Sequence, residues 1–487
     1  MLMELIPSDL INVYRDYQVY DAWYSGDRLR ISNLYQSRLY TPTKEGAFWA
    51  KRSKEHRQVM AHVPVAKDIA ATSASFLFSE HPIITIPDSA TNANALETEN
   101  RLHEIISKGL YYPKFLEAAE IASAMGGVFL KVDWDLGLTN YPILNLVQPD
   151  NAIPVFQYGV LQSVKFVQAI GSEPNSDVVY WLIEEHYSGL IISKLYKGTS
   201  TTLGKEISLQ SLPETASISK EVITGLEGLA TVYIPNNLPN PKYRGLPLGA
   251  SDLEQIDSLM DSLDEEYTSL LRDIRLAKGR LVVPEVFVEY DRENKESVFD
   301  IDQEIFTTIN AATSSEDTSK QLTVTQFAIR SEEHIQAMDF TLRNIFTTVG
   351  YSPQSFGMDV SGAAESGKAL RIRERKSIKT TAKKAEYFAP ALKQILKVVL
   401  EIDALHIGSG IDVFDVNVQI QDSIKNEVED IANSIALLDR ARALSTEAKI
   451  DMLHNDFTPE EKLEEINRIK AEQGMFMPSV DDVISNV

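Results

Sequence analysis

A long stretch of helical periodicity with separated charges restricts the fold of this chain more than any other feature. From Asp252 to Lys278, apolar residues recur every three or four positions, which predicts one amphipathic helix. Ser251 and Glu254 have the spacing of a capping box, so we expect the helix to begin at Ser251. The acids gather in its first half and the bases in its last turns, as the helix macrodipole favours. The acids are Asp252, Glu254, Asp257, Asp261, Asp264, Glu265 and Glu266, and the apolar stripe is Leu253, Ile256, Leu259, Leu263, Leu270 and Ile274. This stripe predicts packing against neighbouring helices.

A second helix follows an insertion. Residues 331–349 have helical periodicity, whereas residues 279–329 contain strand-like runs around a charged turn at Asp291 to Lys295. A small α/β unit is therefore expected between two helices. After a loop rich in glycine and serine, a very long helix is predicted from Lys368 to about Leu405, with a kink at Pro390.

The rest of the chain divides into a helical start, a β-rich middle and a helical end. Val128 to Ile234 is a series of short β-branched and aromatic runs, with a hairpin expected at Ser188–Gly189. The fold class is therefore α+β. The other expected elements are helices at 55–78, 94–108 and 113–125, a strand at 82–87, a proline-rich linker at 236–251, a strand at 411–421 and helices near 424–440, 445–454 and 458–473.

Composition excludes several classes of protein. The 487 residues include no cysteine, which removes disulfides and thiolate metal sites, and no apolar run is long enough to span a bilayer. The N-terminus lacks the pattern of a secretory signal. The net charge of −23 argues against tight DNA binding, because phosphate neutralisation needs a basic surface. It does not argue against a channel through which DNA slides.

Two motifs have a tempting alternative interpretation. Gly362 to Lys368 matches the phosphate-binding P-loop pattern, but Ala369 replaces the hydroxyl residue that binds Mg²⁺, and the preceding residues make a poor strand. A flexible loop of small residues is the better interpretation. Asp133 to Gly137 resembles the start of a calcium loop, but it lacks the later acids and favours a β-turn.

The segment from Lys368 to Lys384 concentrates positive charge. One interpretation is a surface that faces DNA or bridges subunits, through Arg371, Arg375 and Lys379. The other, which we favour, is a solvated helix face that meets acids elsewhere, such as the acidic helix start on a neighbouring subunit.

Several segments, taken in order, resemble the portal protein family of long-tailed, siphovirus-type bacteriophages. The resemblance covers roughly residues 50 to 475. The matching segments are Arg52 with His56, Pro64–Ala66, Phe76–Glu80, Ile84–Ile86, Gly126–Val132, Pro149–Val155, Gly249–Glu254, Ser366–Leu370, Ser445–Glu447 and Leu453–Glu472.

The resemblance implies a portal fold and a ring of about twelve subunits at one capsid vertex. That fold has a mixed α/β wing, a two-helix stem, a small α/β clip, a long kinked helix after a tunnel loop, and a helical crown. The implied division is wing 1–250, stem helix 251–278, clip 279–329, stem helix 330–350, tunnel loop 351–367, wing 368–423 and crown 424–487.

The resemblance also implies partners and site residues. The ring would carry double-stranded DNA during packaging and ejection, and dock the terminase large subunit and then the head–tail connector. It would contact the major capsid and scaffolding proteins, with no membrane, cofactor or catalytic residue. The expected location is the virion portal vertex, and the host cytoplasm during assembly. Clip docking would use Asp291, Arg292, Glu293, Asn294 and Lys295. The channel residues would be Gln354, Ser355, Met358, Asp359, Ser361, Gly362, Ala363, Ala364, Glu365, Ser366, Gly367 and Lys368.

Two alternatives remain. A packaging NTPase would use the segment 362–369, and a capsid adaptor would lack a closed ring.

Overall fold

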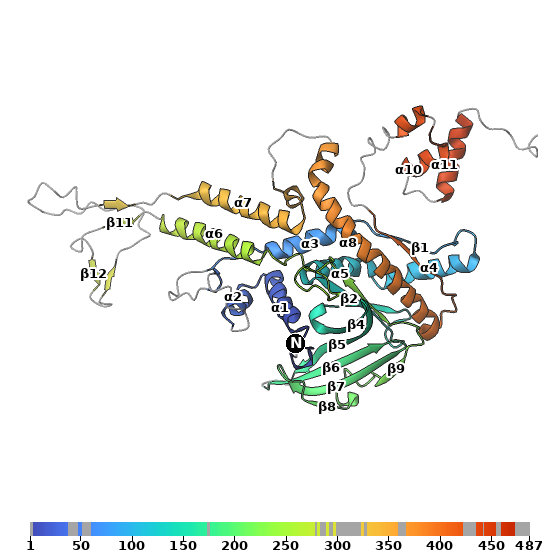
Figure 1. The fold of residues 1–487 in the computed structure, drawn as a ribbon, viewed down its shortest axis with the longest axis horizontal. Coiled ribbons are helices and arrows are strands. Elements are labelled where there is room, and N and C mark those ends of the chain that lie inside the picture. Colours follow the sequence, from blue (N-terminus) through green and yellow to red (C-terminus); the bar gives the residue numbers. More distant parts are fainter. Residues whose placement is uncertain are drawn as a thin grey trace, which may run out of the picture.

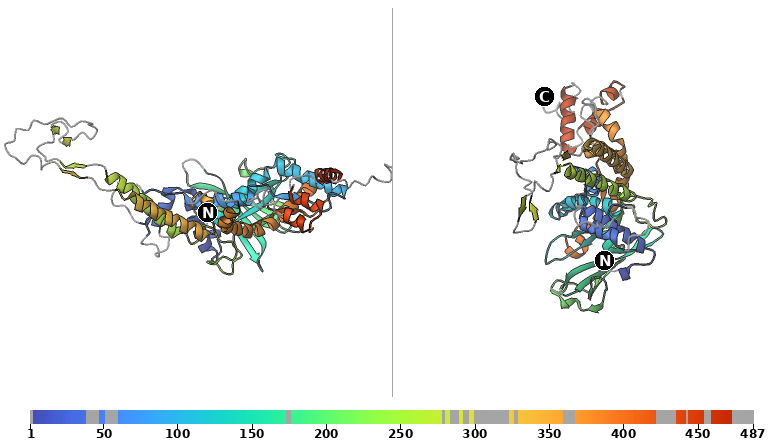
Figure 2. Two further views of the ribbon diagram at one scale, coloured as in Figure 1. Left: turned by 90° about the horizontal axis from the view of Figure 1, so that it is seen from above. Right: turned by 90° about the vertical axis from the view of Figure 1, so that its left-hand side faces the viewer.

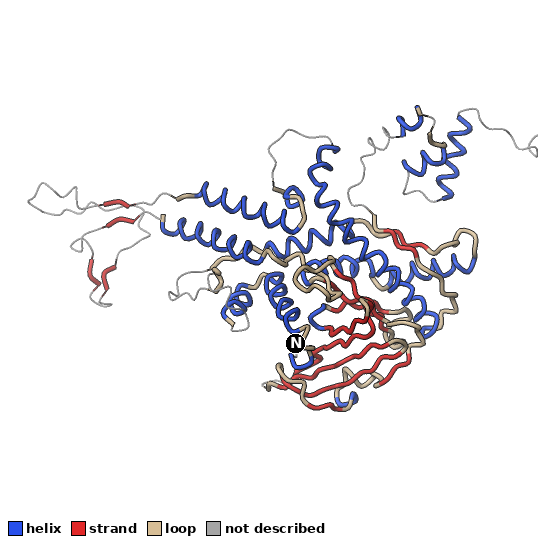
Figure 3. Tube along the Cα trace, in the orientation of Figure 1, coloured by secondary structure: helices blue, strands red, loops and turns tan. Residues whose placement is uncertain are grey.

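The protein is an α+β molecule in which helices, two larger antiparallel sheets and one two-stranded sheet form a body and a pair of helices projects from it (Figures 1 and 3). The computed structural model describes residues 3–37, 47–50, 60–172, 176–277, 280–282, 289–291, 296–298, 323–325, 329–358, 367–421, 435–441, 443–453 and 459–472. Within these ranges, no helix has the length and apolar character needed to cross a bilayer.

The first part of the body is helical. After a short 3-10 turn, η1 (Met3–Leu5), come α1 (Ile11–Ser25), α2 (Arg28–Gln36), α3 (Val65–Phe78), α4 (Ala93–Lys108) and α5 (Tyr111–Met125). α3 and α5 are in contact, and each helix buries several small residues. These residues are Ala66, Ala70, Ser73 and Ala74 on α3 and Ala118, Ala119 and Ala122 on α5.

Two glycines turn the chain from α5 into the first sheet. Gly126 has a φ of 89°, and a Cβ there would lie 2.7 Å from the carbonyl oxygen of Gly249. A Cβ on Gly127 would lie 2.3 Å from the hydroxyl of Tyr233. The predicted end of this helix is therefore confirmed, because only glycine fits the left-handed turn and the close contact.

Both sheets are antiparallel. The smaller has the order β10–β2–β3, from β2 (Gly127–Asp133), β3 (Ile143–Val147) and β10 (Thr231–Pro235). The larger has the order β4–β5–β6–β7–β8, and the predicted hairpin at Ser188–Gly189 joins β6 and β7. Its strands are β4 (Ala152–Gln157), β5 (Val160–Ser172), β6 (Val178–Tyr187), β7 (Leu190–Thr199) and β8 (Lys205–Ile207), with β9 (Glu221–Ile223) paired to β7; the 3-10 turns η3 (Pro149–Asn151) and η4 (Leu209–Ser211) lie between strands.

The projecting pair, which we call the arm, consists of α6 (Asp257–Leu276) and α7 (Ser331–Val349), lying side by side in all views (Figures 1 and 2). Short strands follow at its outer end. β11 (Arg280–Val282) pairs with β14 (Thr323–Thr325), and β12 (Glu289–Asp291) pairs with β13 (Glu296–Val298).

The predicted helix start at Ser251 is wrong, because α6 begins at Asp257. Ser251 does not cap a helix. Its hydroxyl donates to the carbonyl oxygen of Ala124 at 2.6 Å and accepts from the N–H of Leu253 at 3.0 Å. Gln255 has a φ of 70°, which interrupts any helix through this segment. Contacts with α5 therefore override the local capping pattern.

The second half of the chain returns to the body. After η7 (Pro353–Phe356), α8 runs from Gly367 to Ile402 with Pro390 inside it, and ends in a π-helical turn, η8 (Asp403–Ile407). The strand predicted at 411–421 is only β15 (Asn417–Gln419), which pairs with β1 (Ile83–Thr85). The last described helices are α10 (Thr446–Leu453) and α11 (Pro459–Glu472).

Candidate channel segment and its anchorage

The first half of α6 buries a carboxylate that binds the N-terminal part of the chain. Asp264 is fully buried and accepts hydrogen bonds from the indole N–H of Trp49 at 2.9 Å and the backbone N–H of Val63 at 2.8 Å. The Nδ1 of His62 lies 2.8 Å from the same carboxylate. Asp264 is therefore an internal acceptor within the acidic first half of the helix.

Asp261, one turn earlier, plays a similar part. It accepts from the backbone N–H groups of Phe48 at 2.7 Å and Trp49 at 3.1 Å. Burial raises the pKa of Asp261, and the two backbone donors act against that rise. Further along α6, the hydroxyl of Thr268 accepts from the N–H of Ala61 at 3.0 Å. The root of the arm is thus fastened to residues more than 200 positions away.

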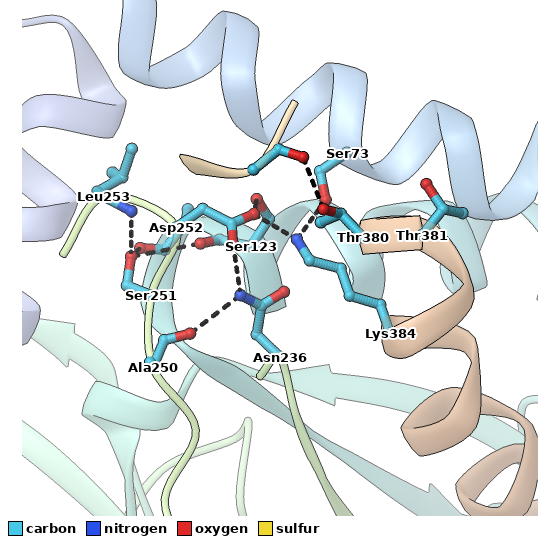
Figure 4. A network of polar contacts seen from close by, with 12 residues as sticks. Ser73, Ser123, Asn236, Ala250, Ser251, Asp252, Leu253, Thr380, Thr381 and Lys384 are labelled. Atoms are coloured by element: carbon cyan, nitrogen blue, oxygen red, sulfur yellow. Dashed lines mark hydrogen bonds and ion pairs between the residues drawn. The ribbon is translucent and has the colours of Figure 1, made fainter. Parts of the chain in front are cut away.

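A second buried network joins the segment before α6 to α8 (Figure 4). Lys384 is 2% exposed and forms an ion pair with Asp252. Asp252 also accepts from the hydroxyl of Ser123 at 2.6 Å and the amide of Asn236 at 2.9 Å, and Lys384 donates to the hydroxyl of Ser73 at 2.7 Å. Burial acts to lower the pKa of Lys384, but Asp252 outweighs it, so the pKa is raised and the side chain stays charged.

The segment between α7 and η7 is tied to α8. Gly350 has a φ of 102°, and its carbonyl oxygen accepts from the hydroxyl of Thr380 at 2.6 Å. The N–H of Ser352 donates to the hydroxyl of Ser377 at 2.9 Å. Two polar contacts therefore fix the point where the chain leaves the arm.

Aromatic stacking strengthens this attachment. Phe356 of η7 lies parallel to Phe346 of α7, with ring centroids 3.8 Å apart. Tyr351 stacks on Phe76 of α3 at 6.2 Å, and the ammonium of Lys384 lies 5.6 Å from the Tyr351 ring centroid. The arm root, α3 and α8 therefore meet around one aromatic and ionic cluster.

The sequence model of one family matches residues 6–477, nearly the whole chain; that family is described as phage portal protein, SPP1 Gp6-like. The chain belongs to this family of phage portal proteins. No curated protein sequence matches it.

Solved structures from gene transfer agent particles are similar at low identity. A chain in the virion of the native gene transfer agent particle is 14% identical, with 82% of this chain and 91% of that chain covered and a TM-score of 0.42. A chain in the neck of the empty particle, computed with C6 symmetry, is 12% identical with the same coverages and a TM-score of 0.44. A chain in the neck of the native particle, computed with C12 symmetry, is 11% identical, with 78% and 98% covered and a TM-score of 0.37.

The predicted channel residues of this portal protein fall partly within the described ranges. Gln354 and Ser355 lie in η7, Met358 lies just after it, and the backbone of Gly367 and Lys368 forms the first turn of α8. The hydroxyl of Ser355 lies 2.8 Å from that of Ser377, within the anchorage described above. The channel role of the whole set remains a prediction. The other residues lie outside the described ranges: Asp359, Ser361, Gly362, Ala363, Ala364, Glu365 and Ser366.

The basic residues between Lys368 and Lys384 do not all lie on one face of α8. Arg375 and Lys379 are exposed one turn apart on α8, as is Lys383, whereas Lys384 points inward to Asp252 of the same chain. Arg371 belongs to α8 as well. The prediction of one solvated basic face is therefore wrong at Lys384, because its ammonium has a buried carboxylate partner.

The clip prediction is scarcely covered by the described residues. Asp291 is the last residue of β12, and Arg292, Glu293, Asn294 and Lys295 lie outside the described ranges.

The structure does not support the P-loop interpretation of Gly362 to Lys368 or the calcium-loop interpretation of Asp133 to Gly137. Residues 353–356 before the P-loop-like segment form a 3-10 helix, whereas a P-loop follows a strand. The predicted turn after Asp133 is confirmed, because the side chain of Asp135 accepts from the N–H of Gly137 at 2.8 Å. In the part of the chain that the structure describes, no three potential metal ligands lie close enough to hold an ion.

Proposed function

We propose that this portal protein assembles into a ring of about twelve copies whose central channel passes double-stranded DNA during packaging and ejection. The arm is the observation that carries the proposal. Two antiparallel helices project from a folded body, end in a small strand-containing insertion and start beside the predicted channel segment. This arrangement suits an element that lines or surrounds an axis shared by several copies.

The surface of the arm supports assembly. Phe340 is 67% exposed, Ile335 58% and Ile274 46%, although each lies on a long, regular helix. Apolar groups on an isolated projection are unfavourable in water and typical of protein contacts. In a closed ring, each arm would be covered by the arms of its neighbours, through a contact between two different surfaces.

The channel segment supports passage of DNA without tight binding. Its ends are held by Gly350 and η7 on one side and by α8 on the other, while the residues between are mostly small and carry few charges. The exposed Arg375 and Lys379 on α8 would provide weak attraction, against a chain with a net charge of −23. A weak, screened interaction is what a sliding polymer requires.

The remaining parts of the proposal concern partners. The clip at the outer end of the arm would dock the terminase large subunit first and a head–tail connector later. The wing would contact major capsid and scaffolding proteins at one vertex of the virion, with assembly in the host cytoplasm. The chain would act as a structural protein, since the energy for packaging would come from the separate terminase.

Native mass spectrometry with negative-stain imaging tests the ring. We expect wild-type rings of about twelve copies, and we expect Phe340→Glu to remain folded but fail to close a ring. Leu138→Glu is the matched control, since Leu138 is 75% exposed on a turn of the body. Rings that form equally well with Phe340→Glu would contradict a contact through the arm. A wild-type monomer with ATP hydrolysis that is lost in Lys368→Ala would instead establish the NTPase alternative.

Crosslinking tests the channel segment, and the chain has no cysteine of its own to interfere. A photoreactive label on Ala363→Cys should crosslink to DNA in particles stalled during packaging. The same label on Thr201→Cys, in an exposed turn of the wing, should not. Equal crosslinking at both positions would show that residue 363 does not face the channel.

A further inference from the structure

The hairpin between β4 and β5 ends in a tyrosine with almost no contact to its own chain. Tyr158 is 96% exposed, and the nearby Val155 and Val160 are 49% and 61% exposed. No charged residue occurs between Asp150 and Lys165, although 24% of the chain is charged. The hairpin tip is therefore an uncharged projection with exposed apolar side chains on a strongly acidic protein.

The backbone of this tip is unfavourable for tyrosine. Tyr158 has a φ of 52° and Gly159 a φ of 80°, so both residues of the two-residue turn are left-handed. Asparagine, aspartate or glycine normally occupies the first of these positions, because a larger side chain meets its own backbone there. A bulky residue that keeps such a conformation without any packing in its own fold indicates a role outside that fold.

The hairpin is held rigidly from behind. Phe156 and Leu161 are cross-strand partners, and the ring of Phe156 lies edge-on to Tyr233 of β10, with centroids 5.8 Å apart. Leu161 packs against the small core that contains Phe129. One face of the hairpin is thus fixed on the smaller sheet, and Tyr158 is presented in a preset position.

The edge of this sheet is protected against strand addition. β4 is the outermost strand, Pro154 has no N–H to offer, and the pairing shifts between Val155 and Phe156. A partner would therefore meet the side chains at the tip, not extend the sheet.

We propose that the β4–β5 tip is a knob through which one copy of this chain docks on the neighbouring copy, an inference that rests on the proposed ring. Two copies with a net charge of −23 each repel one another, so a contact between them needs surface without charge. The tip supplies such a surface. A ring contact is heterologous, so the knob meets a different surface on its neighbour.

The variant Tyr158→Gly distinguishes an effect on assembly from an effect on folding. Glycine relieves the left-handed backbone, so the melting temperature of the monomer should stay the same or rise. The subunit concentration at half-assembly should nevertheless increase roughly tenfold, as expected when an aromatic contact is lost.

Leu110→Gly is the matched control. Leu110 also has a φ of 52° and is 64% exposed, but it lies between α4 and α5. This variant should gain the same backbone relief without any change in assembly. If Tyr158→Gly assembles as the wild type does, or if both variants weaken assembly equally, the proposal is overturned.

Isotope-mixed crosslinking identifies the partner directly. Tyr158→Cys carrying a benzophenone label is assembled from ¹⁵N-labelled and unlabelled chains in equal amounts, and the crosslinked peptides are read by mass spectrometry. Pairs of mixed isotope would establish contact between copies. Pairs of one isotope only, or crosslinks to a capsid protein in whole particles, would overturn the proposal. If the wild type forms rings but either of those results is found, only the knob proposal is refuted. If the wild type forms no rings, the proposed ring itself is refuted.

Discussion

The two halves of α6 treat their polar groups in opposite ways. In the first half, Asp261 and Asp264 are buried and accept hydrogen bonds from the N-terminal part of the same chain. In the second half, Asp273 contacts Arg330, which directly precedes α7, and His334 of α7, each at 3.1 Å and close to solvent, and Ile274 is 46% exposed. The root of the arm is completed by its own chain, whereas the outer half leaves apolar side chains exposed to solvent in the single chain. A single helix therefore belongs to the core at one end and, under the proposed ring, would form an interface at the other.

Removal of Lys384 should have the largest effect on the root. Lys384→Met leaves Asp252 buried without its charged partner, which should reduce the free energy of unfolding by about 3–5 kcal/mol. Lys383→Met is the control, because Lys383 is exposed on the same turn of α8 and its loss should change stability by less than about 0.5 kcal/mol. Urea titration of both variants measures the difference. Equal stabilities would mean that the buried pair does not secure the root.

Substitution of Asp264 should cause the next largest loss of stability. Asp264→Ala leaves the indole N–H of Trp49 and the backbone N–H of Val63 without an acceptor, at a cost of about 2–4 kcal/mol. Tryptophan fluorescence during denaturation should report the loss, because the indole of Trp49 bonds directly to this carboxylate. Asp273→Asn on the outer half should change the melting temperature much less, since its ion pairs are exposed to solvent and screened. A comparable loss in the two variants would remove the distinction between the halves.

The contributions of Asp261 and Asp273 to the free energy of unfolding should change with pH in opposite directions. This is the smallest of the expected effects. Hydrogen bonds from His334 and Arg330 lower the pKa of Asp273, so its contribution is present at neutral pH and is lost as the pH falls. Burial raises the pKa of Asp261, so its contribution grows as the pH falls through its ordinary range. Asp273→Asn should therefore flatten the decline in stability between about pH 5 and 3, and Asp261→Asn should steepen it. Unfolding free energies measured across that range check both slopes, and slopes that change in the same direction would contradict the assignment.

Local signals in the sequence predict much of the fold. The helix end at Gly126 and the hairpin at Ser188–Gly189 depend on neighbouring residues, and the structure confirms both. The predicted start of α6 is wrong because Ser251 and Glu254 have only the spacing of a local cap, while the contacts that decide the conformation come from Ala124 on α5. Local sequence patterns predict the conformation where local interactions determine it. They fail where contacts with a distant element determine it.

The buried polar contacts and the exposed hairpin tip are harder to predict for the same reason. Seven acids on one predicted helix look alike in the sequence. Asp264 nevertheless lies in the core, where it accepts hydrogen bonds from Trp49 and Val63, more than 200 residues earlier in the chain. Lys384 looks like its basic neighbours until Asp252 is placed beside it. Tyr158 attracts no attention in a hydrophobic run, and its exposure and positive φ appear only in the folded chain.

The length of α8 has a mechanical consequence. A helix of 36 residues is about 54 Å long, and Lys384 lies close to its middle, while Arg101 grips the buried Asp403 just beyond its end at 2.8 Å. The helix is thus attached to the body at its middle and just beyond its C-terminal end, whereas its N-terminal end follows the predicted channel segment in the sequence. A force on that end becomes a torque about Lys384. Pro390, which lacks the N–H that would complete the helical hydrogen-bond ladder, lies between these two points of attachment.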